Sequence, residues 1–353
     1  MKLRVFRAAA ALLLVAACAS TPASSWAEVA LPGAAPRIVR DAIECGGRWY
    51  VVGGWKGTDG ETGPAAWDSI DGVTWRSLTF SPLPDSFYGP SNVLSAVACA
   101  NGKIAAIGAR SGGAHGNPRV STWYERSDGV LAEAPATFET YGGGTAVALG
   151  RISGGPSGFL IAGNRTSGAA AWLSADGKAF QLFENAPGLA GPGTVAQDGA
   201  VMARQFVLVG GVAVTGSLDQ APAAWTSPDG ARWTRAEVPG EAGYEELQRV
   251  VQLGADLIAV GPRGDTFGAW RGPAWTAVGR FGKTTKTGIR SLTVAGSRLY
   301  AATPDALWYS DDAGKSWHSS TPPAGATQLE AVAGRGDQVL VVAADRLWLS
   351  HGV

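Results

Sequence analysis

Few side chains in this sequence have the types and spacings that catalysis requires. Its 353 residues include only three histidines, and none has an identifiable partner for general-base chemistry or a neighbouring set of zinc ligands. No Gly-X-Ser-X-Gly elbow marks a serine nucleophile, and the calcium-loop pattern of EF-hands is absent. We therefore predict no catalytic residue, no metal site and no cofactor. The histidines are His115, in a glycine-rich loop, and His318 and His351, which are expected at the surface.

A short apolar run near the N-terminus predicts export from the cytoplasm. Residues 8–17 are all apolar, and Lys2, Arg4 and Arg7 precede them. Ten residues are too few to cross a bilayer, which needs about 20, but they suit the apolar region of a secretory signal.

The end of this run, Val15-Ala16-Ala17-Cys18, resembles the lipobox of bacterial lipoproteins. That resemblance implies that residues 1–17 are a signal peptide and that Cys18 carries lipid. Residues 18–25 would then form a short tether to the outer side of the bacterial cytoplasmic membrane. Ordinary cleavage after small residues near Ala27 is the alternative.

Composition argues for an all-β protein without affinity for nucleic acid. Removing the three basic residues of the signal from 29 Lys and Arg leaves 26, against 29 Asp and Glu. A mature charge of about −3 gives no electrostatic footprint for nucleic acid. The 50 glycines and 20 prolines, together with 46% hydrophobic residues, suit many short strands joined by turns rather than disorder.

One structural unit recurs seven times along the chain. Each copy contains an apolar strand, a glycine-bearing turn, a second apolar strand and a third strand with a tryptophan. The spacings between these tryptophans run from 38 to 56 residues, the range of four-stranded propeller blades. The tryptophans are therefore expected in the core. They are Trp67, Trp123, Trp172, Trp225, Trp270, Trp308 and Trp348.

A turn with a fixed pattern follows most of the third strands. In Ser69-Ile-Asp-Gly-Val-Thr-Trp75, the aspartate is expected to accept hydrogen bonds from backbone N–H groups, and the glycine to adopt a positive φ. The tryptophan then covers the hairpin, so the pattern is structural rather than catalytic. The predicted turn residues are Asp71, Gly72, Trp75, Asp176, Gly177, Asp229, Gly230, Trp233, Asp312, Gly314 and Trp317.

These turns resemble the Asp-box of sialidase-type BNR propellers, over essentially all of residues 26–353. The resemblance implies an all-β, seven-bladed β-propeller built from four-stranded antiparallel blades. It does not carry sialidase activity with it. Arg37-Ile38 is followed by Val39 where sialidases have proline, the rest of their arginine triad has no counterpart, and known sialidases have six blades.

The two ends of the sequence are predicted to complete one blade together. The last unit stops after its third strand, and Trp26–Pro32 matches the fourth-strand segment Trp233–Pro239. We expect Trp26 to Leu31 to pair with Leu347 to Ser350, which closes the ring and removes open sheet edges.

Cys45 and Cys99 occupy equivalent positions in neighbouring units, each just before a turn. Exported proteins meet an oxidising compartment, which favours a disulfide. Stacked sheets lie about 10 Å apart, however, and a disulfide needs Cα atoms within about 7 Å. A disulfide and a pair of buried free thiols therefore both stay open.

The loops that join the second strand to the third, and the fourth to the next blade, form the face where propellers usually bind ligands. Trp55, Tyr88, Tyr141 and Tyr244 lie in these loops and are candidate contact residues. The alternative is that each covers the end of its own blade.

We expect a lipid-anchored, monomeric binding or assembly scaffold with a protein or glycan partner. Its closest analogy is the photosystem II assembly-factor type of Asp-box propeller, at the level of the fold only. A glycan-binding or glycan-cleaving propeller is the alternative. Glycan cleavage would need a deep pocket with two carboxylates about 5–10 Å apart, whereas a scaffold needs a broad, partly apolar face.

Overall fold

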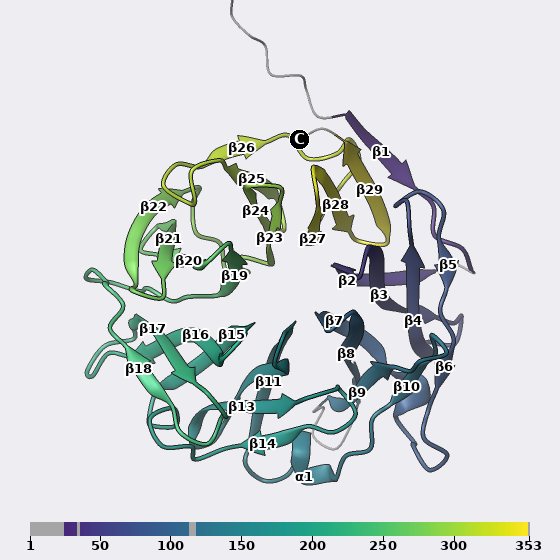
Figure 1. The fold of residues 1–353 in the computed structure, drawn as a ribbon, viewed down its shortest axis with the longest axis horizontal. Coiled ribbons are helices and arrows are strands. Elements are labelled where there is room, and N and C mark those ends of the chain that lie inside the picture. Colours follow the sequence, from purple (N-terminus) through teal and green to yellow (C-terminus); the bar gives the residue numbers. More distant parts are fainter. Residues whose placement is uncertain (1–24, 34–35, 113–117, 352–353) are drawn as a thin grey trace, which may run out of the picture.

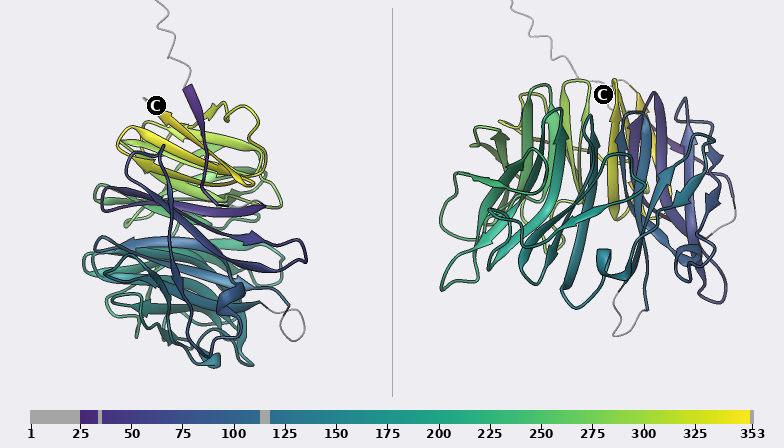
Figure 2. Two further views of the ribbon diagram at one scale, coloured as in Figure 1. Left: turned by 90° about the vertical axis from the view of Figure 1, so that its right-hand side faces the viewer. Right: turned by 60° about the horizontal axis from the view of Figure 1, so that its bottom comes forward.

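Seven β-sheets stand around a central axis like the blades of a propeller (Figure 1). The computed structural model describes residues 25–33, 36–112 and 118–351. The predicted seven-bladed β-propeller is confirmed. Viewed from its edge, the disc carries its hairpins and loops on two opposite faces (Figure 2). Among the described residues, no helix is long and apolar enough to span a bilayer.

Each blade runs from an inner first strand to an outer fourth strand. Blade 1 consists of β2 (Arg37–Cys45), β3 (Arg48–Lys56), β4 (Thr62–Ser69) and β5 (Arg76–Ser77). Blade 2 consists of β7 (Val93–Ala100), β8 (Lys103–Arg110), β9 (Arg119–Glu125) and β10 (Leu131–Glu133). Blade 3 consists of β11 (Ala146–Gly155), β12 (Gly158–Arg165), β13 (Gly168–Ser174) and β14 (Gln181–Phe183). Blade 4 consists of β15 (Thr194–Met202), β16 (Gln205–Ala213), β17 (Gln220–Ser227) and β18 (Thr234–Ala236).

The remaining three blades follow the same plan. Blade 5 consists of β19 (Arg249–Leu253), β20 (Asp256–Arg263), β21 (Thr266–Gly272) and β22 (Thr276–Phe281). Blade 6 consists of β23 (Ser291–Ala295), β24 (Arg298–Thr303), β25 (Ala306–Ser310) and β26 (His318–Ser320). Blade 7 consists of β27 (Leu329–Arg335), β28 (Gln338–Ala343), β29 (Arg346–His351) and β1 (Ser25–Val29).

Blade 2 departs from the predicted four antiparallel strands. The short strand β6 (Phe80–Ser81) leaves blade 1 and pairs in parallel with β10, which makes this sheet five-stranded. Two short helical segments also occur, the 3-10 helix η1 (Gly89–Ser91) and α1 (Phe138–Tyr141). Both lie between blades, beside blade 2, where the connections are long enough to form structure of their own.

The repeated tryptophans hold the blades and the loops together. Six of the seven third-strand indoles are buried; that of Trp308 is only partly buried. The indole of Trp123 donates a hydrogen bond to the side chain of Asn92, in the loop that precedes its own blade (3.3 Å). Three others donate to a backbone carbonyl of the loop that precedes their own blade. Trp67 reaches the carbonyl of Pro32 (3.0 Å), Trp172 that of Thr140 (2.6 Å) and Trp270 that of Pro239 (2.9 Å). These bonds fix the fourth-to-first-strand loops to the core.

The Ser-X-Asp turns share one hydrogen-bond pattern. In the first of them, Asp71 Oδ1 accepts from the backbone N–H groups of Val73 (2.8 Å) and Thr74 (2.7 Å), while Ser69 Oγ accepts from Gly72 (2.8 Å). Backbone N–H groups stabilise the charged carboxylate, so the pKa of Asp71 is well below its usual range. The indole of Trp75 donates to the Gly72 carbonyl, and Gly72 has a φ of 78°. The turns at Asp229 and Asp312 repeat this arrangement, with Trp233 and Trp317 as the covering indoles; at Asp176 the serine and aspartate contacts also recur.

Strands β1 and β29 close the ring as predicted. Trp26 pairs with Ser350, Ala27 with Leu349 and Val29 with Leu347, in antiparallel register. Figure 1 shows β1 at the outer edge of blade 7.

Cys45 and Cys99 form a disulfide between blades 1 and 2, with Cα atoms 5.5 Å apart. The first strands converge toward the axis, so neighbouring blades approach much more closely there than flat stacked sheets do. Gly46 and Gly102 follow in the adjoining turns, and an added Cβ on Gly46 would lie only 3.7 Å from the Gly102 Cα atom. This convergence brings the two sulfur atoms within bonding distance.

Candidate functional site

The two faces of the disc differ in what they carry. The hairpins between first and second strands and the Ser-X-Asp turns lie on one face, called the turn face below. The other connections form the opposite loop face. A pocket of about 550 Å³ opens on the loop face beside blade 2, lined by residues 83–88, 118–121 and parts of 133–142.

One wall of this pocket is fixed by a buried carboxylate at the end of β10. Glu133 accepts hydrogen bonds from Ser121 Oγ (2.7 Å), Ser86 Oγ (2.8 Å) and the backbone N–H of Leu83 (3.1 Å). Gly89 lies against it so closely that an added Cβ would be 2.1 Å from the carboxylate. Glu133 therefore fastens the loop that carries Phe87 and Tyr88 to the blade.

The opposite wall is the single turn of α1. Tyr141 is buried, its hydroxyl lies 3.0 Å from Thr122 Oγ1, and burial raises its pKa to about 12. The buried Arg165 donates to the carbonyls of Gly142 (2.9 Å) and Glu139 (3.3 Å) at the end of this turn. The wall is thus held by the core of blade 3 as well as by blade 2.

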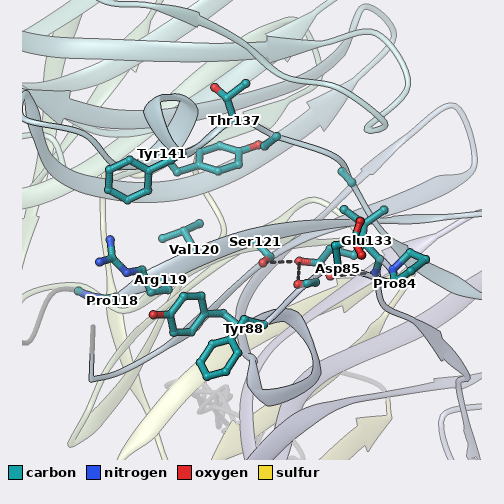
Figure 3. Close-up of a pocket in the computed structure, with 17 residues that line it drawn as sticks. Pro84, Asp85, Tyr88, Pro118, Arg119, Val120, Ser121, Glu133, Thr137 and Tyr141 are labelled. Carbon is teal, nitrogen blue, oxygen red and sulfur yellow. Dashed lines mark hydrogen bonds between the residues drawn. The ribbon is translucent and has the colours of Figure 1, made fainter. Parts of the chain in front are cut away.

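One arginine side chain and three aromatic rings surround the opening of this pocket. The Arg119 guanidinium lies 5.8 Å from the ring centre of Tyr88 and 5.0 Å from that of Phe138. Phe87 meets Tyr88 edge to face, with ring centres 4.9 Å apart. Phe87 is 75% exposed and Phe138 is 56% exposed. Figure 3 shows Tyr88 and Tyr141 on opposite sides of the pocket, with Arg119 near one end and Glu133 at the other.

This arrangement favours binding over proton transfer. Arg119 has no carboxylate within 4.0 Å in the described part of the chain, so its charge is free for a ligand. Exposed aromatic rings beside an unpaired guanidinium offer stacking, apolar contact and a charge-assisted hydrogen bond. Glu133 already accepts three hydrogen bonds and lies buried behind them.

The structure brings two of the four predicted contact residues together. Tyr88 and Tyr141 line the same pocket, although Tyr141 forms its inner wall rather than its rim. Trp55 is exposed and rests on Gly63 beside a separate cavity of about 430 Å³ at blade 1. Tyr244 donates to Glu246 (3.3 Å) and lies in neither cavity; burial and the charge of Glu246 raise its pKa to about 12.

Three of the most informative residues were not among the four predicted. Arg119 and Phe138 were missed because their role depends on two loops meeting across a blade. Glu133 had a usable signal, since it is the one acidic residue in the apolar sequence Leu131-Ala-Glu-Ala134. A charged side chain in such a strand indicates a buried hydrogen-bonded group.

The other residues singled out in the sequence do not line this pocket in the described part of the chain. His318 is exposed, with its ring 5.2 Å from that of Tyr309. Cys18 and His115 lie outside the described residues, as does the side chain of His351. Within the described ranges, no group of three or more His, Cys, Asp or Glu residues is placed to hold a metal ion.

Comparison with solved structures agrees with the architecture. The chain has a β-propeller fold. Virginiamycin B lyase from Staphylococcus aureus superposes with a TM-score of 0.62 at 12% identity, over 94% of this chain and 100% of the lyase. A catalytically inactive variant of the same lyase, with quinupristin, gives a TM-score of 0.60 at 11% identity, over 94% of this chain and 100% of that one.

Two further structures with a similar fold are domains of other proteins. The β-propeller domain of the Trilobed protease from Pyrococcus furiosus, described as having an open velcro topology, gives a TM-score of 0.57 at 10% identity, covering 90% of this chain and 94% of that domain. An extracellular domain of a one-component system from B. thetaiotaomicron gives 0.56 at 8% identity, covering 92% and 39%. At these identities the likeness shows the fold alone. No protein-family model and no curated protein sequence matches the chain.

Proposed function

We propose that this protein is an extracytoplasmic binding module that takes a segment of a partner protein into the loop-face pocket at blade 2. The observation that carries the proposal is the unpaired Arg119 between the rings of Tyr88 and Phe138. The expected segment presents an acidic group next to an apolar or aromatic side chain. The acid would meet the guanidinium, and the apolar group would enter between Tyr88 and Tyr141.

The preformed walls support this role. Glu133 and Arg165 hold the two sides through hydrogen bonds to the loops that form them, so little conformational entropy is lost when a ligand enters. Exposed aromatic residues and arginine are also the residue types that dominate protein–protein binding energy.

Glycan cleavage, the alternative, finds less support in this pocket. Its two lining carboxylates are Asp85 and Glu133. Glu133 is buried with three donors around it, so it is not poised to exchange a proton with a substrate. A pair of available carboxylates is what that chemistry requires.

Pocket variants test the proposed binding. A partner is captured by cross-linking to the intact protein and identified by mass spectrometry, and its affinity is then measured with purified components. We expect Arg119→Ala and Tyr88→Ala to weaken binding about 30-fold each, as loss of a hot-spot contact does. Trp55→Ala, at the separate cavity on the same face, is the matched control. Equal affinities for all three variants and the wild type would contradict the proposal.

We also propose that a lipid on Cys18 anchors the module outside the cytoplasmic membrane. The Cys45–Cys99 disulfide supports an oxidising compartment. Seven residues, 19–25, separate Cys18 from Trp26, a distance of at most about 25 Å when fully extended. Because Ser25 pairs with His351 at the turn-face end of β29, the tether would join the propeller on that face.

The turn face is therefore expected to lean toward the bilayer. Single cysteines at Ala231, in an exposed turn, and at Gly144, in an exposed loop, report the two faces; an added Cβ at Gly144 meets no atom within 4 Å. On intact spheroplasts, a bulky maleimide should label Ala231→Cys several-fold more slowly than Gly144→Cys. The same two variants without the lipid anchor should react alike. Equal labelling on the anchored protein would refute the orientation.

A further inference from the structure

The cavity of about 430 Å³ at blade 1 shares no lining residue with the pocket at blade 2. Several of its lining side chains lie on one face of the blade 1 sheet. Arg37 on β2 pairs in register with Trp55 on β3, and Trp67 on β4 pairs with Ser77 on β5. Paired residues of an antiparallel sheet share a face, and so do residues four apart along a strand. Because Val51, the partner of Trp67, precedes Trp55 by four positions, all of these side chains lie on the same face.

The walls of this cavity offer aromatic and aliphatic surface. Trp55 is 41% exposed, and its indole rests directly on the backbone of Gly63, where an added Cβ would lie 2.4 Å from the ring. The buried Trp67 and the partly buried Leu78 and Phe80 also line the cavity. An exposed indole held against backbone, next to buried apolar side chains, suits the stacking of a flat apolar ring.

Hydrogen bonds hold the segment that enters β2 against the rest of this cavity. The backbone N–H of Lys56 donates to the carbonyl of Pro36 (3.1 Å). Nη2 of Arg37 donates to the carbonyl of Gly33 (2.7 Å). Together with the bond from the Trp67 indole to this segment, they form the wall before a ligand enters, which lowers the entropy cost of binding.

The cavity is lined by two basic side chains, Arg37 and Lys56, and by no aspartate or glutamate. In the described ranges, neither basic group has a carboxylate oxygen within 4.0 Å. The Nε of Arg37 is buried without an acceptor, and its Nη1 has no hydrogen-bond partner among the described residues. Uncompensated positive charge beside apolar walls favours a ligand that combines an anionic group with an apolar body.

We propose that the cavity at blade 1 binds a small aromatic carboxylic acid. Its ring would stack on Trp55, and its carboxylate would accept hydrogen bonds from Arg37, with Lys56 as a second positive charge. The cavity volume falls in the range of small-molecule sites, about 300–1,000 Å³, and is too small for a folded partner. This site is separate from the loop-face pocket at blade 2 and does not rest on the function proposed for that pocket.

Three probes test the ligand class by calorimetry on the full chain at equal ionic strength. They are 2-naphthoate, its neutral analogue 2-naphthamide, and acetate, which has the charge without the ring. We expect 2-naphthoate to bind at least about tenfold more tightly than 2-naphthamide, because the amide loses the charge-assisted hydrogen bond. Acetate should bind more weakly than either. An acid that does not bind, or that binds no more tightly than its amide, would overturn the proposal.

Four variants locate the site. Arg37→Gln should weaken 2-naphthoate to the affinity of 2-naphthamide and leave the amide unchanged, a selective loss that damage to the fold could not produce. Lys56→Gln should weaken the acid selectively by several-fold, and it decides the matter if Arg37→Gln does not fold. Trp55→Ala should weaken both probes about tenfold, because both lose the stacked ring. Arg235→Gln, on the exposed outer strand β18, should bind both as the wild type does. A wild-type ratio of acid to amide affinity in the Arg37 and Lys56 variants would refute the site.

Discussion

A chain that begins at residue 33 should melt about 10 °C or more below one that begins at residue 19. The missing segment contains β1, whose Val29, with the following Leu31, lies buried in the core cluster of blades 7 and 1. Burial of such a side chain is worth about 1.5–3 kcal/mol, and 1 kcal/mol shifts the Tm of a protein of this size by about 2–4 °C. The loss also removes the pairing with β29 and the Glu28–Arg346 ion pair.

A chain that begins at residue 25 is the matched control, because it keeps β1 and loses only the residues before it. Its Tm should equal that of the longer chain. The shortest chain should in addition aggregate more readily, since β29 becomes an unprotected sheet edge. Calorimetry and light scattering on the three chains give both results. A shared melting temperature would show that β1 does not hold the ring closed.

Loss of the Cys45–Cys99 disulfide should lower the free energy of unfolding by about 2–4 kcal/mol, because the bond closes a loop over 54 positions of the chain. The double variant Cys45→Ser and Cys99→Ser should therefore melt several degrees below the wild type. Dithiothreitol should lower the wild type to the same Tm and leave the variant unchanged.

Thiol labelling of the unreduced, denatured protein supplies the independent check. With the disulfide present, neither Cys45 nor Cys99 should react until a reductant is added. Two reactive thiols in the unreduced chain would rule the bond out, whatever the melting temperatures showed.

The fold followed from the sequence because its strongest signals are local and repeated. The number of third-strand tryptophans gives the number of blades, and the match of Trp26–Pro32 with Trp233–Pro239 locates the closing strand. Strand β6 escaped prediction because two residues, Phe80 and Ser81, carry no periodicity, and their pairing with β10 depends on where blade 1 ends in space.

The sites could be predicted less well from the sequence, because they depend on distances between residues of different blades. Tyr88 could be predicted because it lies in a loop of the usual binding face. Arg119 could not, because its role depends on its contact with Phe138 across the pocket. The two buried carboxylates on inner strands of blades 1 and 4 were missed for a similar reason. Asp41 and Asp198 each come just after an irregularity in strand register, so their equivalence is visible only once β2 and β15 are paired with their neighbours.

Blade 7 differs from the other six in the order in which its parts are made. The inner four strands of each other blade are consecutive in the chain, so they can form from neighbouring segments. The pairing of Trp26 with Ser350 instead joins residues that all the other blades separate in the sequence. Contacts between such distant residues form late, because the intervening chain must be ordered first. Strand β1 thus leaves the ribosome before the other strands and is the last to find its partner, and the ring stays open until β29 has been made.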